Sequence, residues 1–212
     1  MYTPAHFAVD DEGTRAFLSA IEAADLVTVT ERGLVATFLP FVFAPERGQH
    51  GSLIGHVARK NEQWQLPRVG QALVIAHGKE AYISPSWYPS KAEHGRVVPT
   101  WNYTTAHVYG ELVIHDDAAW VDDMVRQLTD RQEGGRSQPW NVDDAPAAFH
   151  EGQLRGIVGV EVVIDRVEAK FKMSQNQKEA NVEGVVAGLR QDGREDVAAL
   201  VDSLRRSSRR VR

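Results

Sequence analysis

The chain of 212 residues contains no cysteine, which excludes disulfides, zinc-thiolate sites, iron–sulfur clusters and thiol catalysis together. It also contains no run that approaches the roughly 18 apolar residues of a membrane-spanning helix. The first residues, MYTPAHFAVDDEG, show no basic stretch followed by an apolar one. We therefore expect no secretory signal and a cytoplasmic location.

Motifs of the common nucleotide-binding, hydrolytic and metal sites are absent as well. The sequence has no GxGxxG after a strand, no P-loop, no HExxH, no GxSxG and no EF-hand spacing. Dinucleotide-binding, NTPase, zinc-protease and hydrolase classes are thereby disfavoured. Among the eight histidines, His50 and His56 are the only pair near a candidate site, and the pair is a weak metal signal, so no metal is predicted.

The chain has fewer basic than acidic residues: 24 Lys and Arg and 29 Asp and Glu, which gives a net charge of −5. A protein whose whole surface binds nucleic acid is usually basic, so any such contact would be local. No helix-turn-helix with a basic recognition helix is visible, which leaves direct DNA binding open. The arginine-rich end, RRSSRRVR, is interpreted as a solvated tail.

Aromatic side chains are concentrated in one stretch, residues 82 to 109. Six of the ten Trp and Tyr residues fall there: Tyr82, Trp87, Tyr88, Trp101, Tyr103 and Tyr109. Hydroxyl, amide and basic side chains lie between them: Ser84, Ser86, Ser90, Lys91, His94, Arg96, Thr100, Asn102, Thr104 and Thr105. A pure core would be less polar, so we interpret this stretch as part of a pocket for a planar ligand.

Periodicity predicts many strands with helices gathered at the two ends. Strands are expected at residues 26–30, 34–43, 72–77, 79–84, 100–114 and 159–173, and a short one precedes residue 56. Helices are expected within residues 4–24, after a cap at Asp116 or Asp117, from a cap at Asp144 to about Leu154, and twice after Asn176. This pattern is typical of a mainly β, α+β barrel at residues 1–176 with a C-terminal helical extension at 177–212.

The segment ERGQHGSLIGHVARKN at residues 46–61 combines glycines with Arg59 and Lys60. Glycines let backbone N–H groups approach a ligand, and adjacent cations neutralise a phosphate. Taken alone, the segment fits a solvated charged turn slightly better.

Several motifs, in the same order, resemble the PaiB family of FMN-binding proteins, often labelled negative transcriptional regulators. They are MYTPAHF at the start, GSLIGHVARKN (51–61), AYISPSWYPSK (81–91), VPTWNY (98–103), HVYG (107–110) and KMSQN (172–176). The resemblance implies a split β-barrel, as in pyridoxamine-phosphate oxidases and small flavin reductases. It also implies a homodimer with two FMN sites at the interface, each built from both subunits.

FMN needs a phosphate cradle, a flat wall for the isoalloxazine, and polar groups for the pyrimidine edge. Under the resemblance, four sets of residues supply these: His56, Arg59, Lys60 and Asn61 at the phosphate; Ser84, Ser86, Trp87 and Tyr88 at the ribityl chain and ring edge; Trp101, Asn102 and Tyr103 as the wall; and Lys172, Ser174, Gln175 and Asn176 as closure. Catalytic residues are not assigned.

Three functions remain open at this point. The resemblance favours a flavin-dependent transcriptional regulator or sensor; an FMN-dependent oxidoreductase is the alternative, and a haem-handling protein ranks last. Missing acid or base motifs do not count against an enzyme, because a flavin carries its own chemistry. A homodimer is also expected because a lone barrel would expose Trp87, Tyr88 and Trp101.

Overall fold

The computed structural model describes residues 1–210, with side chains described up to Arg205. The chain divides into two compact units. The first unit comprises Met1–Gly13, His77–Thr105 and the residues from Ala169 onward; the second comprises Thr14–Ala76 and Ala106–Glu168.

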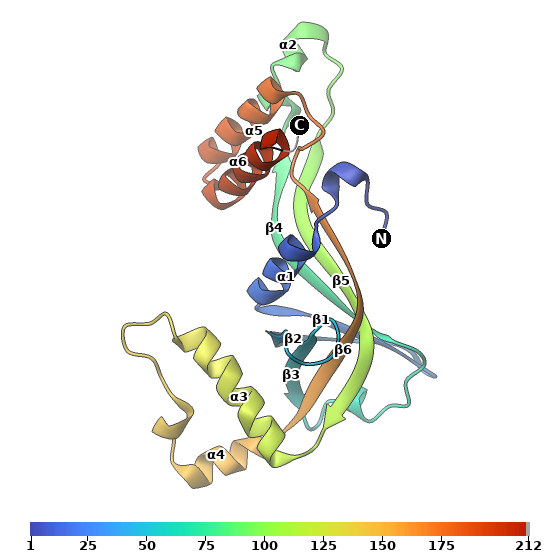
Figure 1. Cartoon of the computed structure of the whole chain (residues 1–212), viewed down its shortest axis with the longest axis vertical. Helices are drawn as coiled ribbons and strands as arrows, with labels where there is room; N and C mark the ends of the chain where they lie inside the picture. The colour runs from blue at the N-terminus through green and yellow to red at the C-terminus, as the bar shows by residue number, and fades with distance from the viewer. Residues whose placement is uncertain (211–212) are drawn as a thin grey trace. The chain divides into compact units, whose positions relative to one another are not determined.

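Six strands form a closed barrel in the order β1-β2-β3-β6-β5-β4 (Figure 1). The strands are β1 (Ala23–Thr30), β2 (Gly33–Ala44), β3 (Ser52–Ala58), β4 (Ala72–Ile83), β5 (Thr100–His115) and β6 (Ile157–Lys172). Neighbours β1 and β2, β1 and β4, β2 and β3, and β3 and β6 all pair antiparallel. The predicted α+β barrel is confirmed.

The hairpin of β1 and β2 forms where Glu31 and Arg32 make the turn, as predicted. Gly33, paired with Thr30, has φ +103°, a conformation that glycine adopts without steric cost. Alternation buries Leu26 and Leu39 and turns Val29, Leu34 and Phe38 outward. The outer face of this hairpin is therefore apolar: Leu34 is 75% exposed and Phe38 70% exposed.

Two local predictions were wrong. Residues 72–83 form one continuous strand, β4, because the backbone passes through Gly78 without a break. Asp144 does not cap the helix of residues 147–154; its carboxylate accepts the backbone N–H of Asn141 at 2.8 Å, in a separate 3₁₀ turn. Pro146 occupies the capping position instead.

The helices are α1 (Asp11–Ala20), α2 (Ser90–His94), α3 (Ala118–Glu133), α4 (Ala147–Leu154), α5 (Glu179–Gln191) and α6 (Glu195–Arg210). Four 3₁₀ turns accompany them: η1 (Ala5–Phe7), η2 (Glu62–Trp64), η3 (Pro85–Trp87) and η4 (Val142–Asp144). The predicted cap of α3 is confirmed, since Asp117 Oδ1 accepts the N–H of Trp120 at 2.8 Å. No helix within residues 1–210 is long and apolar enough to cross a membrane.

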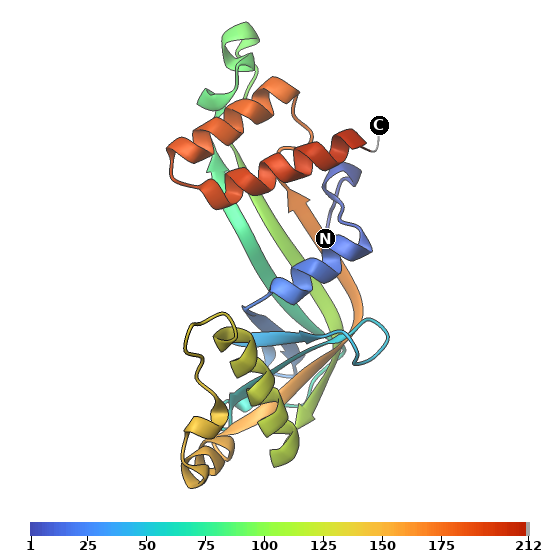
Figure 2. The ribbon, with the colours of Figure 1, turned by 60° about the vertical axis from the view of Figure 1, so that its left-hand side comes forward.

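The core of the first unit lies between the end of β4 and the helix pair of α5 and α6, which lie side by side (Figures 1 and 2). Ala81, Ile83, Tyr88 and Met173 pack there against the apolar faces of both helices. α5 approaches η3 so closely that a Cβ on Gly188 would lie 2.2 Å from the Trp87 ring, and one on Gly184 1.9 Å from the Trp87 carbonyl oxygen. The predicted domain boundary at residue 176 falls inside this unit and stays a prediction.

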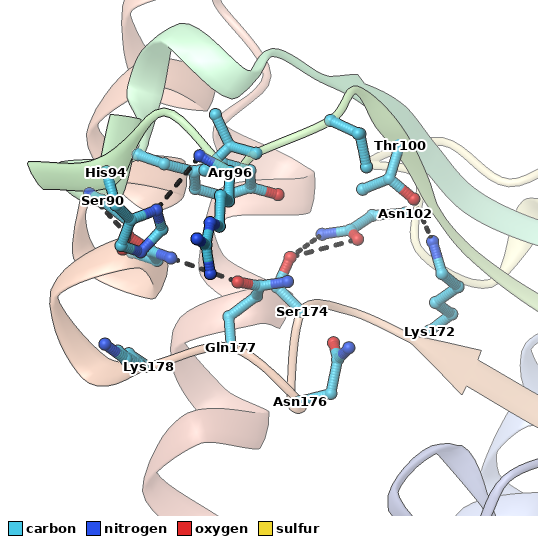
Figure 3. A pocket seen from close by; sticks show the side chains of 14 residues that line it. Ser90, His94, Arg96, Thr100, Asn102, Lys172, Ser174, Asn176, Gln177 and Lys178 are labelled. Carbon is cyan, nitrogen blue, oxygen red and sulfur yellow. Dashed lines mark hydrogen bonds between the residues drawn. The ribbon is translucent and has the colours of Figure 1, made fainter. Parts of the chain in front are cut away.

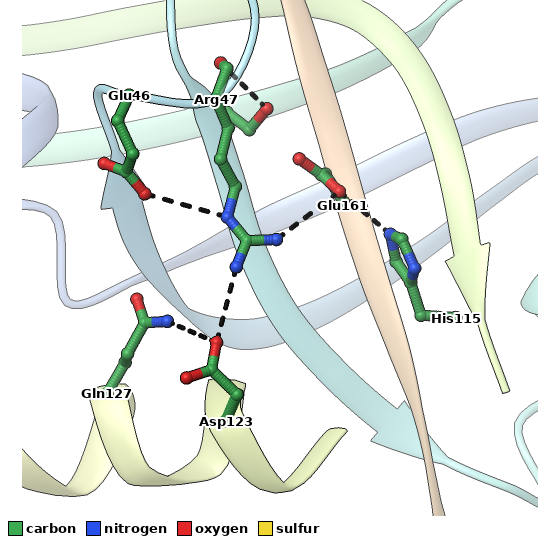
Figure 4. Close-up of polar contacts among 7 residues, drawn as sticks. Glu46, Arg47, His115, Asp123, Gln127 and Glu161 are labelled. Carbon is green, nitrogen blue, oxygen red and sulfur yellow. Dashed lines mark hydrogen bonds and ion pairs between the residues drawn. The ribbon is translucent and has the colours of Figure 1, made fainter. Parts of the chain in front are cut away.

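A polar network fixes α3 to the barrel in the second unit (Figure 4). The half-buried Arg47 reaches Glu161 at 3.9 Å and Asp123 at 3.4 Å, and Glu161 also contacts His115 Nε2 at 2.8 Å. The His115 ring stacks on Trp120 with centroids 3.8 Å apart. Trp120 is thus structural.

Candidate functional site

A pocket of about 400 Å³ lies in the first unit, where α2, the start of β5, the end of β6 and the start of α5 meet (Figure 3). Its lining is mostly polar: Tyr88, Ser90, His94, Arg96, Val97, Val98, Thr100, Asn102, Lys172, Ser174, Asn176, Gln177, Lys178 and Asn181. The volume is in the range of pockets that hold small ligands.

The lining carries cations and no carboxylate. Arg96, Lys172 and Lys178 contribute three positive charges, while no Asp or Glu lines the pocket of a chain whose net charge is −5. Among the side chains that the structure describes, up to Arg205, neither the Arg96 guanidinium nor the Lys178 ammonium has a hydrogen-bond or ion-pair partner. Unpaired cations beside hydroxyls and amides favour an anionic ligand, above all a phosphate ester.

Lys172 lies at the opposite side of this pocket from α2 (Figure 3). Its Nζ donates to Thr100 Oγ1 and to the carbonyl oxygen of Trp101, both at 2.5 Å. Burial, and secondarily the charge of Lys170, lower the pKa of Lys172 below its usual range.

Asn102 and Ser174 form the floor of the pocket, and both are buried. Asn102 Nδ2 lies 3.0 Å from Ser174 Oγ, and Ser174 Oγ lies 3.2 Å from Asn102 Oδ1. Ser174 has φ +65° and is, within residues 1–210, the only residue other than glycine in the left-handed region. Such backbone strain concentrates at functional sites.

A buried hydrogen-bond chain joins α2 to α5 at the side of the pocket. Asn181 Oδ1 accepts from Ser90 Oγ at 2.8 Å and from the Ser90 backbone N–H at 3.3 Å. Asn181 Nδ2 in turn donates to Gln177 Oε1 at 3.2 Å. These bonds hold the two walls together before any ligand enters.

The Tyr88 hydroxyl is a buried polar atom that lines the pocket and makes no hydrogen bond in the described part of the chain. The residue is 4% exposed, and burial raises the pKa of its phenol. A buried hydroxyl without a partner is costly, which a ligand acceptor would relieve. The orphaned hydroxyl, the cations and the amides together fit the phosphate and ribityl part of FMN.

The structure brings five predicted site residues into this pocket: Tyr88, Asn102, Lys172, Ser174 and Asn176. Four others lie next to it but engage their own surroundings. Ser84 Oγ caps η3, and Ser86 Oγ accepts a hydrogen bond from Lys91 Nζ. Trp87 packs against α5. Gln175 forms hydrogen bonds with the backbone of Phe171 and Met173.

The predicted wall is split between two faces of β5. Asn102 is 1% exposed on the pocket side, whereas Trp101, its neighbour in the strand, is 45% exposed. Tyr103 lies on the same face as Trp101, with Lys170 Nζ 5.4 Å from its ring centroid. Within one chain, a ligand in the pocket therefore does not stack on Trp101 or Tyr103.

The predicted phosphate residues, His56 to Asn61, lie in the second unit. Arg59 binds the Asp116 carboxylate with two nitrogens, at 3.1 and 2.5 Å, and donates to the carbonyl oxygens of Arg155 and Ile157. Asn61 caps η2 and donates to Thr37. Burial lowers the pKa of His56, so its imidazole is mainly neutral at pH 7, and Lys60 is exposed.

Several lining residues were not predicted as ligands. Ser90, His94, Arg96 and Thr100 belong to the polar aromatic stretch, so the density of polar side chains there was a usable signal. No such signal existed for Gln177, Lys178 and Asn181, because neither the residues that lead into a helix nor its first turn carry a sequence mark of facing a pocket.

Comparison with known proteins places the chain in a family. Residues 1–166 match the family described as "Putative FMN-binding domain". The "Protease synthase and sporulation protein PAI 2" of Bacillus subtilis is 31% identical over 197 residues, which cover 91% of this chain and 90% of that protein. The chain belongs to the PaiB family of FMN-binding proteins. FMN is the cofactor of this family, as the resemblance implied.

Solved structures show the same split barrel as the PaiB-family chain described above. The FAD and haem binding protein of Mycobacterium smegmatis has a TM-score of 0.55 at 16% identity, covering 77% of this chain and 71% of that one. The flavocytochrome Anf3 of Azotobacter vinelandii has a TM-score of 0.54 at 13% identity, covering 76% and 67%. At these identities the likeness establishes the fold alone.

Proposed function

We propose that this PaiB-family protein is a cytoplasmic flavin-dependent transcriptional regulator or sensor that holds the FMN phosphate in the pocket of the first unit. The observation that carries the proposal is the lining of the pocket, with three cations, no carboxylate and the unpartnered Tyr88 hydroxyl. Arg96 and Lys178 neutralise the phosphate, and the side chains of Asn102 and Asn176 orient the ligand. Bound FMN supplies reversible electron transfer at its isoalloxazine.

The isoalloxazine requires a wall that the pocket does not contain, which supports a site shared between two copies of the chain. The outer face of the β1 and β2 hairpin offers a surface for a second copy. Val29 pairs with Leu34 and Asp25 pairs with Phe38, so three exposed apolar side chains follow one another on that face. Exposed apolar patches of this kind mark interaction surfaces.

The pocket adjoins the helix pair of α5 and α6, which in a regulator would transmit the effect of ligand binding. Asn176, Gln177 and Lys178 lead directly into α5, and Asn181 lies in its first turn. α5 is tied to α6 by Arg205, whose guanidinium lies 3.1 Å from Glu179 and 3.4 Å from Glu183. Occupancy of the pocket therefore bears on α5 and, through it, on α6.

The test compares FMN with riboflavin, which lacks the phosphate. A charge-assisted hydrogen bond contributes about 1.5 to 3 kcal/mol, so Arg96→Ala should weaken FMN binding by roughly ten- to a hundredfold, nearer the lower figure because Arg96 is exposed. Riboflavin affinity should hardly change. Fluorescence titration of the apo-protein with both flavins measures the difference in affinity. Equal losses of affinity for FMN and riboflavin would show that the phosphate does not bind in this pocket.

Arg59 and Lys60 provide the rival phosphate site and therefore the control. Arg59 already satisfies its donors through Asp116 and two carbonyl groups, so Arg59→Ala should leave FMN affinity within about twofold of the parent. A selective loss of FMN in Arg59→Ala or Lys60→Ala, with Arg96→Ala unaffected, would move the phosphate to the second unit.

The oxidoreductase alternative is decided by turnover. A flavin absorbance spectrum, with no oxidation of NADH or NADPH in stopped-flow mixing with added FMN, is the result expected for a regulator or sensor. Turnover at rates of about 1 per second or more would make the protein an enzyme instead. A Soret band in the purified protein would select the haem-handling alternative.

A further inference from the structure

We propose that Lys172 is a nucleophilic amine that forms a reversible imine with small anionic aldehydes entering the pocket of the first unit. The proposal rests on the anion-binding character assigned to that pocket under the proposed function. It does not depend on flavin. The ligand class follows from two features of the lining: an amine at one side, and the unpaired cations Arg96 and Lys178 across the pocket from it.

The hydrogen bonds of Lys172 leave its lone pair available. A neutral amine has two N–H bonds and one lone pair in a tetrahedral arrangement. Both N–H bonds are used, since Nζ donates to Thr100 Oγ1 and to the Trp101 carbonyl oxygen, each at 2.5 Å. Both acceptors are neutral oxygens, and no carboxylate is among the described side chains that line the pocket with this nitrogen.

The surroundings of Lys172 increase the fraction of its neutral form, which is the form that attacks a carbonyl carbon. Partial burial and the charge of Lys170, two residues earlier on the same strand, both lower the pKa of Lys172. His94 at the end of α2 lines the pocket, and Arg96, which follows α2, and Lys178, which precedes α5, add positive charge to it. Buried lysines with lowered pKa values are the ones that form Schiff bases.

The reaction needs no oxidant or reductant. The Nζ lone pair attacks the aldehyde carbon, the C=O π bond opens, one N–H proton passes to the carbonyl oxygen, and a carbinolamine forms. The hydroxyl group and the second N–H proton then leave as one water molecule, which leaves a C=N bond between Lys172 and the ligand, and addition of water reverses the reaction. The carboxylate or phosphate of the ligand remains ionised and is held by the cations of the lining.

The experiment traps the imine in the full-length protein. Glyoxylate, an aldehyde with a carboxylate, is added with sodium cyanoborohydride, which reduces the imine to a stable secondary amine, and the labelled lysines are identified by peptide mass spectrometry. Lys172 should be labelled at least about fivefold faster than Lys170 at pH 7. The matched neutral aldehyde, acetaldehyde, should show a smaller preference, because it gains nothing from Arg96 or Lys178.

Two variants make the result specific. Lys172→Arg keeps the charge and should abolish the fast labelling, whereas Lys170→Arg, whose native ammonium donates to the carbonyl oxygen of Tyr2, should retain it. Arg96→Gln should slow glyoxylate and leave acetaldehyde unchanged. Equal labelling of Lys170 and Lys172, or fast labelling that persists in Lys172→Arg, would overturn the proposal.

FMN titration of the same preparation separates this inference from the proposed function. Fast labelling of Lys172 in a protein that binds no FMN would refute the flavin assignment and support the imine. Tight FMN binding with unselective labelling would support the flavin assignment and refute the imine. Added FMN should slow the labelling of Lys172 if both ligands use the pocket.

Discussion

Ser174 combines burial, a left-handed backbone and a hydrogen bond to Asn102 at a single residue of the pocket floor. A left-handed conformation costs an L-residue with a side chain about 1 to 2 kcal/mol, and glycine avoids most of that cost. The strain is tolerated because Ser174 lies just after β6, in the turn toward α5, and keeps its hydroxyl on Asn102.

Two substitutions at Ser174 separate strain from hydrogen bonding. Ser174→Ala loses the hydroxyl and keeps the strain, whereas Ser174→Gly loses the hydroxyl and relieves the backbone. We expect both to unfold more readily than the parent in urea, with Ser174→Gly more stable than Ser174→Ala by about 1 kcal/mol. Equal midpoints for the two variants would show that the backbone conformation carries no cost.

Residue-level prediction from sequence succeeded where the cause is local and failed where it is not. The cap at Asp117, which succeeded, depends on a neighbour three residues away. The pairing of Arg59 with Asp116 joins residues 57 positions apart, and no local pattern announces it. A sequence can therefore show which residues are chemically suited to bind a ligand, but not which residues they pair with in the fold.

The helices α3 and α4 are joined by a cluster of charges in the second unit. Arg126 contacts Asp122 and Asp143, each at 2.9 Å, and His150 Nε2 contacts Asp122 from α4. The hydrogen bond from Arg126, followed by that from His150, lowers the pKa of Asp122 below its usual value of 3.8. The folded protein thus releases this proton more readily than the unfolded chain.

The pH dependence of stability follows from that direction. A carboxyl group whose pKa is lower when folded stabilises the protein above its unfolded pKa of 3.8, and this stabilisation is lost as the pH falls through the folded value. Asp122→Asn should therefore flatten the acid limb of a stability curve measured from about pH 5 downward. Asp130→Asn, at an exposed position on α3, should keep the same dependence of stability on pH as the parent protein. If Asp122→Asn also kept it, the charge cluster would be excluded as the source of the acid limb.

At the level of elements, hydrophobic periodicity predicted the barrel strands and both terminal helices, but not how the helices cover the aromatic stretch. Tyr88 and Trp87 were expected to be exposed, and this was wrong. Tyr88 is 4% exposed and Trp87 is half-buried, because α5 and α6 pack over them. That contact joins residues about a hundred positions apart. The sequence therefore showed the apolar stripe of α5 but not the residues against which it packs.

The homodimer is a prediction about the whole molecule that now rests on the hairpin face rather than on Trp87 and Tyr88. Phe38→Lys should convert a dimer into a species of 23.6 kDa in light scattering at micromolar concentration. Phe149→Lys is the matched control, because Phe149 is 59% exposed in the same unit but lies outside the hairpin. A parent protein that is already monomeric would exclude the dimer altogether.

The arginine-rich tail gives a second whole-molecule prediction. Deleting Ser207 to Arg212 should leave FMN affinity unchanged, since the described residues that line the pocket all precede this segment. These residues lie beyond the described side chains, so the expectation rests on the sequence. Fluorescence titration of the truncated protein measures it, and a large loss would mean that the tail reaches the ligand.

The close approach of α5 to η3 has a consequence for how sequences of this family can diverge. At position 188 the obstacle is the Trp87 ring, so a relative with a larger residue there must carry a smaller one at position 87. At position 184 the obstacle is a backbone carbonyl oxygen, which no exchange of side chain removes. An alignment of relatives should therefore show positions 87 and 188 covarying, while glycine persists at 184 whatever stands at 87.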